Sequence, residues 1–86
     1  MTQQLNAERR KLHFRSCHRG IKEMDIIFGK FADVVLGDLP EEELMDYQRI
    51  LELPDDKLLS WATGREDVPD DARSPLLDRL LSLEHM

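Results

Sequence analysis

The residues with the greatest potential for chemistry lie together between Cys17 and Asp25, in the segment CHRGIKEMD. Nine positions hold a thiol, an imidazole, a guanidinium, an ammonium group and two carboxylates, with a glycine among them. Such side chains act as nucleophiles or as metal ligands, and they are also common where one helix ends and the next begins. The spacing of the residues distinguishes between these possibilities.

A metal site would require His13 and Cys17, which lie four residues apart and therefore share one face of a helix. Structural zinc needs four ligands and catalytic zinc usually three. His18 points about 100° away from Cys17 around an α-helix, and His85 lies near the C-terminus. The spacing does not supply the completing ligands. We therefore expect no metal, a half-buried cysteine and a histidine on a basic face.

Cys17 is also a weak candidate for a catalytic nucleophile. Its basic neighbours Arg15, His18 and Arg19 favour a thiolate. However, Cys17 is expected near the end of a helix, whose partial negative charge opposes a thiolate, and no oxyanion-hole motif accompanies it. We predict a packed cysteine and a protein that is not an enzyme.

Gly20 and Glu23 have the spacing of a helix cap. With Gly20 in the cap position, the Glu23 side chain would reach back to an unpaired N–H at the start of the second helix. Asp25 would place another carboxylate near the positive end of the helix dipole. This interpretation explains Glu23 without any function.

Capping does not account for the hydrogen-bond donors that precede it, which are Arg15, Ser16, His18 and Arg19. Two interpretations stay open. The donors could belong to a solvated basic helix. Alternatively, they could form a polar edge that meets a partner where Gly20, which has no side chain, lets the backbone approach closely.

Five helices are predicted to position this segment, because apolar residues recur every three or four positions and no segment alternates as a strand would. Capping residues, prolines and glycines indicate where the helices begin and end. The expected boundaries are Asn6 to about His18 with Gly20 ending the helix, a second helix up to Gly37, a third from Pro40, a fourth from Asp55 to Thr63 closed by Gly64, and a fifth that opens with Ser74 and Pro75.

The apolar faces are predicted to pack into a single all-α domain, a compact five-helix bundle over residues 1–86 with frayed ends at about 1–5 and 84–86. The segment 64–73 is expected to be a polar connection. The residues expected on the apolar faces are Met24, Ile27, Phe28, Phe31, Val34, Val35, Leu44, Tyr47, Ile50, Leu51, Leu58, Leu59, Trp61, Ala62, Leu76, Leu77, Leu80 and Leu81.

Composition limits the possible functions. The net charge of the 86 residues is −6, but residues 1–22 hold six basic residues and one acidic residue, against six and seventeen in residues 23–86. Polyanions repel such an acidic body, and no aromatic residues interleave with the basic ones, so we expect a protein partner and no nucleic acid. The single cysteine and the lack of a signal sequence or a long apolar run predict a cytoplasmic protein without membrane insertion.

Three segments of the sequence resemble those of a known family. Residues 15–25, RSCHRGIKEMD, fit the pattern R-S-x-x-R-G-x-x-E-x-D and resemble the signature of the SdhE family of FAD assembly factors. LPEEEL followed by YQRILEL, and then DDKLLSWATG, resemble later segments of that family in the same order. The resemblance covers residues 9–83. Its strength lies in the order of the three segments, because a bare R-G-x-x-E would recur by chance.

The resemblance implies a five-helix fold and an assembly role. It implies binding to the flavoprotein subunit of succinate dehydrogenase, and often of fumarate reductase, to promote covalent attachment of FAD to a histidine of that subunit. FAD would be carried by the partner, and the factor would hold no cofactor stably. Matched residue by residue, the resemblance implies that Arg19, Gly20 and Glu23 are the functional residues, with Arg15, Ser16 and Asp25 beside them. An antitoxin-like regulatory interaction protein is the alternative, and a nucleic-acid binder that uses the first helix is a third hypothesis.

Overall fold

Five α-helices and two short 3₁₀ helices form the regular structure of residues 6–86, the part of the chain that the computed structural model describes. The α-helices are α1 (Ala7–Cys17), α2 (Lys22–Val35), α3 (Leu44–Leu51), α4 (Asp55–Ala62) and α5 (Pro75–Ser82). The 3₁₀ helices are η1 (Glu41–Glu43) and η2 (Asp70–Ala72), and no strand occurs within this part. The all-α, five-helix prediction is confirmed. Residues 1–5, expected to be frayed, lie outside the described residues.

Local capping determines several helix ends. The Asn6 side chain accepts a hydrogen bond from the Arg9 backbone N–H at 2.8 Å, which satisfies a donor that the first turn of α1 leaves unpaired. Ser74 does the same for the Leu77 N–H at 3.1 Å. Gly64 follows α4 with φ of +79°, a conformation that glycine adopts without strain. These predicted boundaries are confirmed.

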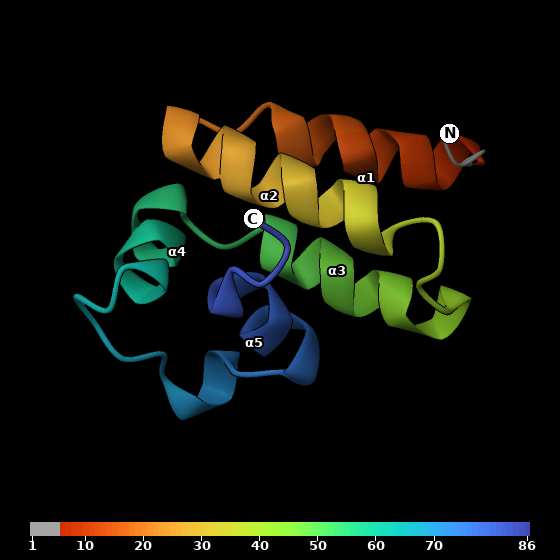
Figure 1. Ribbon diagram of the computed structural model, residues 1–86. Coiled ribbons are helices and arrows are strands. Elements are labelled where there is room, and N and C mark those ends of the chain that lie inside the picture. The colour runs from red at the N-terminus through yellow and green to blue at the C-terminus, as the bar shows by residue number, and fades with distance from the viewer. Residues whose placement is uncertain (1–5) are drawn as a thin grey trace.

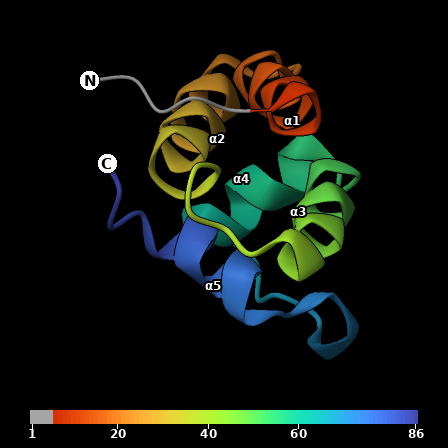
Figure 2. The same ribbon diagram turned by 90° about the vertical axis from the view of Figure 1, so that its right-hand side faces the viewer.

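The helices pack in two layers, with α4 across one end (Figure 1). Helices α1 and α2 run antiparallel and form one layer, and α3 and α5 form the other (Figure 2). Helix α4 lies at the end where the chain turns from α1 into α2, and it packs against both α2 and α5. This arrangement brings the CHRGIKEMD segment beside the junction between α3 and α4.

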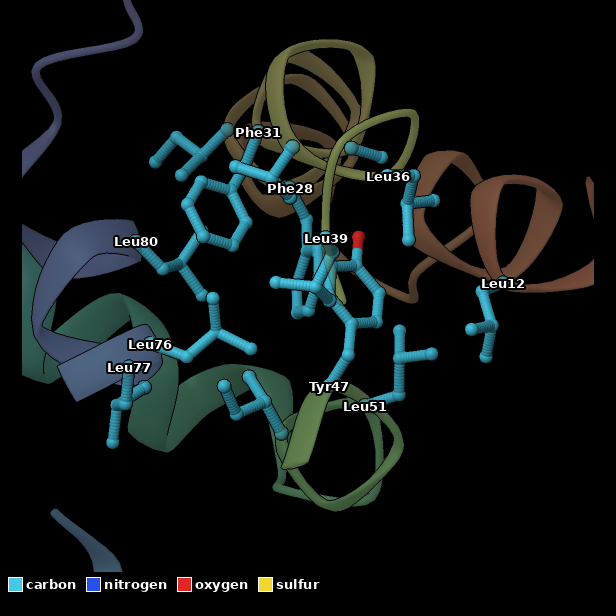
Figure 3. Packing of buried hydrophobic residues seen from close by; sticks show 14 of the residues in the cluster. Leu12, Phe28, Phe31, Leu36, Leu39, Tyr47, Leu51, Leu76, Leu77 and Leu80 are labelled. Atoms are coloured by element: carbon cyan, nitrogen blue, oxygen red, sulfur yellow. The ribbon is translucent and has the colours of Figure 1, made fainter. Parts of the chain in front are cut away.

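The core lies between the two layers, where side chains of α2, α3 and α5 point toward one another (Figure 3). Tyr47 is fully buried at its centre, and its ring lies 5.5 Å from that of Phe28 and 6.2 Å from that of Phe31. Its hydroxyl group shares a hydrogen bond of 2.6 Å with Ser16 of α1, which satisfies a polar group that would otherwise destabilise the core.

The structure differs from the predictions at the edges of the helices. The helix expected from Pro40 begins as η1 and becomes α-helical only at Leu44, and the expected polar connection contains η2. Val34 is 50 % exposed, because the surface between α2 and the end of α5 forms a shallow groove that it lines. The helices of residues 6–86 are too short and too polar to cross a membrane.

The residues after α5, expected to be frayed at about 84–86, contact α2 through His85. The imidazole of His85 lies 5.1 Å from the Phe31 ring, and its Nε2 lies within hydrogen-bond distance, 2.9 Å, of the Ile27 carbonyl oxygen. Leu83, with φ of 60°, turns the chain back after α5. The tail therefore packs against α2, a contact that depends on residues 58 positions apart in the sequence.

Candidate functional site

The side chain of Arg19 is directed into the protein at the turn between α1 and α2. Its Nε donates to Asp55 Oδ1 at 2.6 Å, and its terminal nitrogens donate to the carbonyl oxygens of Leu51 at 2.8 Å and Leu53 at 2.9 Å. The guanidinium also lies 5.2 Å from the centre of the Phe28 ring, a distance at which a cation is attracted to an aromatic face. Only 9 % of the side chain is exposed. Arg19 therefore joins the α1–α2 turn to the α3–α4 junction.

Asp55, the first residue of α4, binds the next residue of the turn as well. While its Oδ1 accepts from Arg19, its Oδ2 accepts from the backbone N–H of Gly20 at 2.8 Å. One carboxylate thus holds a side chain and the adjacent backbone in fixed relation to α4. The geometry suits a carboxylate, which accepts with both oxygens.

Gly20 itself is exposed, and the structure gives no internal reason for a glycine there. Its φ is not in the left-handed region, where among glycines only Gly64 is found in residues 6–86. A Cβ added at Gly20 would lie 3.4 Å from Asp55 Oδ2, at the near limit of ordinary contact. Neither the backbone conformation nor the internal packing requires a residue without a side chain at this position. A partner that approaches this backbone closely from outside would require one.

The predicted capping box is wrong. The N-cap of α2 is Ile21, with extended backbone and no side-chain cap, and Glu23 is exposed on the first turn of the helix. Within residues 6–86 the Glu23 carboxylate forms no hydrogen bond or ion pair. The Gly20 N–H, from which Glu23 would accept in a capping box, donates to Asp55 instead, and Asp25 accepts from the Arg19 backbone N–H. The result is a carboxylate that faces solvent.

The other two residues singled out from the sequence differ in their surroundings. Ser16 is fully buried, and its hydroxyl donates to the Leu12 carbonyl at 2.7 Å while it shares the hydrogen bond with Tyr47. Arg15 is half exposed and pairs with Glu52 of the α3–α4 junction at 2.7 Å. Of the six residues, Ser16, Arg19 and Asp25 thus serve the internal structure, whereas Arg15, Gly20 and Glu23 lie at the surface.

Cys17 packs between α1 and α2. A Cβ at Gly29 would lie 3.2 Å from its Sγ, so the glycine allows the two helices to approach at this point. Burial raises the pKa of the Cys17 thiol, and Asp33 and Asp25 raise it further, which disfavours a nucleophilic thiolate.

The possible metal ligands His13 and Cys17 do lie on the same face of α1, with 3.8 Å between His13 Nδ1 and Cys17 Sγ. The other ring nitrogen of His13 lies 2.6 Å from Asp33 Oδ1 of α2. Residues 6–86 contain no group of three or more histidine, cysteine, aspartate or glutamate side chains placed to hold a metal ion. One ring nitrogen of His18 has a partner elsewhere, since its Nδ1 lies 2.8 Å from the Phe14 carbonyl oxygen, and its ring stacks on that of Phe14 with centroids 4.0 Å apart.

No motif or spacing in the sequence assigns Asp55 to this site. Asp55 is recognisable as a carboxylate at a helix start, but nothing in the spacing pairs it with Arg19, 36 residues earlier. A groove beside Glu23 was also missed. It has a volume of about 230 Å³ and is lined by Glu23, Leu59, Ser60, Thr63 and Arg65. These residues come from α2, α4 and the segment after α4.

Comparison with known proteins identifies the family. The family described as the flavinator of succinate dehydrogenase matches residues 10–84. The chain is 42% identical over 77 residues to the FAD assembly factor SdhE of Acetobacter pasteurianus. These residues cover 90% of this chain and 71% of that protein. It is 40% identical over 55 residues to SdhE of Shewanella oneidensis. These residues cover 64% of this chain and 67% of that protein.

A mitochondrial relative is similar over nearly the whole chain. The succinate dehydrogenase assembly factor 2 of Yarrowia lipolytica is 32% identical over 85 residues, which cover 94% of this chain but only 59% of that longer protein. Residues 10–84, which match the family, span Arg19, Gly20, Glu23 and Asp55. The chain therefore belongs to the family of succinate dehydrogenase flavinators.

Proposed function

We propose that this protein binds the flavoprotein subunit of succinate dehydrogenase and promotes the covalent attachment of FAD to that subunit. Family membership supports the role, and the structure offers a surface for it. The observation that carries the proposal is the exposed carboxylate of Glu23, which has no partner within residues 6–86 and lies next to an exposed glycine.

The surface is held rigid before the partner arrives. Arg19 and Asp55 tie the backbone at Gly20 to α4, and Asp25 binds the Arg19 backbone from the other side of the turn. A binding surface that is already ordered loses less conformational entropy on association. In this proposal Arg19, Asp25 and Ser16 shape the surface, and Gly20 and Glu23 contact the partner.

Each contact residue has a chemical role. Gly20 lets the partner's backbone or flavin region approach closely. The Glu23 carboxylate accepts hydrogen bonds from a partner arginine, or it binds one nitrogen of a partner histidine and so fixes which nitrogen carries the proton. Arg15, half exposed and paired with Glu52, lies at the edge of the same surface.

The factor acts by holding the flavoprotein in a competent conformation, so the bond to FAD forms within the partner and the factor is not an enzyme. FAD is carried by the flavoprotein, and the factor keeps no cofactor of its own. The flavoprotein of fumarate reductase is proposed as a second client. The factor works without inserting into the membrane.

The test is capture of the flavoprotein subunit from the same genome, followed by in-gel flavin fluorescence of the captured subunit. Glu23→Gln and Gly20→Arg should abolish most of the covalent flavin while the thermal unfolding of the factor stays near that of the wild type. Glu42→Gln, at an exposed carboxylate of η1, is the matched control and should behave as wild type. Full flavinylation with both site variants would contradict the proposal.

A further inference from the structure

We infer that the partner surface includes the groove lined by Glu23, Leu59 and Arg65, and that this groove receives a segment of the flavoprotein with a basic, an apolar and an acidic side chain. The inference rests on the proposed function and adds a second charged contact, at Arg65. Apart from Glu23, the lining residues lie outside the R-G-x-x-E segment.

The size of the groove fits a protein side chain better than a small molecule. Its volume of about 230 Å³ lies below the ~300 to 1,000 Å³ that is usual for sites that enclose small molecules. Leu59 is its one large aliphatic lining residue, half-buried and flanked by Ser60 and Thr63. An apolar side chain inserted here would be dehydrated against Leu59, with polar groups at the rim.

The two charged residues that line the groove are unpaired, unlike charged residues near them. Lys57 pairs with Glu66 at 3.1 Å, and Arg19 pairs with Asp55 at 2.6 Å. Glu23 and Arg65 line the same groove, yet within residues 6–86 they pair neither with each other nor with other side chains. A partner segment with a base opposite Glu23 and an acid opposite Arg65 would complement both.

Both walls are fixed relative to each other. The start of α2 is attached to the start of α4 through Asp55 and its bonds to Arg19 and Gly20. After α4, the Arg65 backbone N–H donates to the Ser60 carbonyl at 2.8 Å, and the Thr63 hydroxyl donates to the Leu59 carbonyl at 2.8 Å. The fold therefore holds the backbone at both charged residues, which limits the spacing of charges that a partner can match.

The mixture of charges selects the class of partner. A nucleic acid or an anionic membrane would need a surface of one sign, and Glu23 would repel it. One acid and one base that line a groove together with an aliphatic residue match a peptide segment with side chains of both signs.

The first test is the Kd for the purified flavoprotein subunit at low and high salt. Arg65→Glu should weaken binding about tenfold at low salt, because it replaces an attraction with a repulsion. Raising the ionic strength should reduce this difference, since exposed charges are screened. Arg49→Glu, on α3 with a side chain 75% exposed, is the matched control and should bind as wild type. Thermal unfolding should be unchanged in Arg65→Glu, whereas Arg49→Glu also removes the exposed Arg49–Asp46 pair at 3.4 Å and should lower stability slightly.

A second variant tests the groove itself without changing its charge. Thr63→Tyr places a bulky side chain at an exposed lining position and should also weaken binding about tenfold. If Glu23→Gln weakens binding but Arg65→Glu and Thr63→Tyr bind as wild type, the groove proposal is wrong and the proposed function stands. If the wild type does not bind the flavoprotein at all, both proposals are wrong.

Discussion

Asp55 binds Arg19 and Gly20 with its two separate oxygens, 2.6 Å from the Arg19 Nε and 2.8 Å from the Gly20 backbone nitrogen. Only 18% of the Asp55 side chain and 9% of the Arg19 side chain are exposed. A charge pair so far removed from water costs much to dehydrate, and it is tolerated only because Arg19 also donates to two backbone carbonyls. The turn that carries Gly20 and Glu23 therefore depends on α4 for its conformation.

Removal of the Asp55 carboxylate should destabilise the whole domain. In Asp55→Ala the Arg19 guanidinium stays largely buried without its counter-charge, and we expect a loss of about 3 kcal/mol in the free energy of unfolding. Urea denaturation monitored by circular dichroism measures this change. Asp56→Ala removes the neighbouring exposed carboxylate and should cost less than about 1 kcal/mol. Equal effects of the two substitutions would show that the Arg19–Asp55 pair contributes little.

The Ser16–Tyr47 hydrogen bond should show coupling in a double-mutant cycle. Ser16→Ala leaves the buried Tyr47 hydroxyl without a partner, which we expect to cost about 1 to 2 kcal/mol. In the background of Tyr47→Phe, which has no hydroxyl, the same serine substitution should cost clearly less. Additive effects in urea denaturation would mean that the two groups do not interact.

The Cys17 thiol should react slowly. Burial, Asp33 and Asp25 raise its pKa in the folded protein, so less thiolate is present at pH 8 than in the unfolded chain. The rate of alkylation by iodoacetamide, followed across pH with and without urea, should rise at higher pH in the native protein. Because the folded form favours the neutral thiol, this group's contribution to stability is complete below the unfolded pKa and is lost as pH rises through the folded pKa. If the pH midpoint of the alkylation rate in the native protein lay at or below that in the unfolded chain, the result would contradict the structure.

The two glycines next to α4 should respond differently to alanine. Gly20 does not have positive φ and has room for a Cβ, so Gly20→Ala should change stability by less than about 0.5 kcal/mol. Gly64 has φ of +79°, and Gly64→Ala should cost about 1 kcal/mol. Thermal or urea denaturation of the two variants provides the comparison. A large loss of stability in Gly20→Ala would assign that glycine an internal role and weaken the case for a partner contact.

Much of the fold could be predicted from the sequence because the relevant interactions are local. The Asn6 and Ser74 caps act on backbone groups three residues away, and Gly64 terminates α4 by its own backbone preference. The same holds for the buried faces, since helical periodicity places Phe28, Phe31 and other apolar residues on one side. Val34 fits the same periodicity and is exposed, because burial also depends on which neighbouring helix covers each part of the face.

The sequence proposed candidate site residues through helix ends, charge and family resemblance, but tertiary structure determined what each of them contacts within the protein. Glu23 had the spacing of a cap, yet its carboxylate faces solvent because Asp55 already binds Gly20 and Asp25 binds the Arg19 backbone. Arg19 had the type of a contact residue, yet it is an internal link to the α3–α4 junction. Local spacing specifies only what a side chain could bind within its own helix. Which group it does bind depends on the packing of α4 beside the turn, and that packing is the result of the whole core.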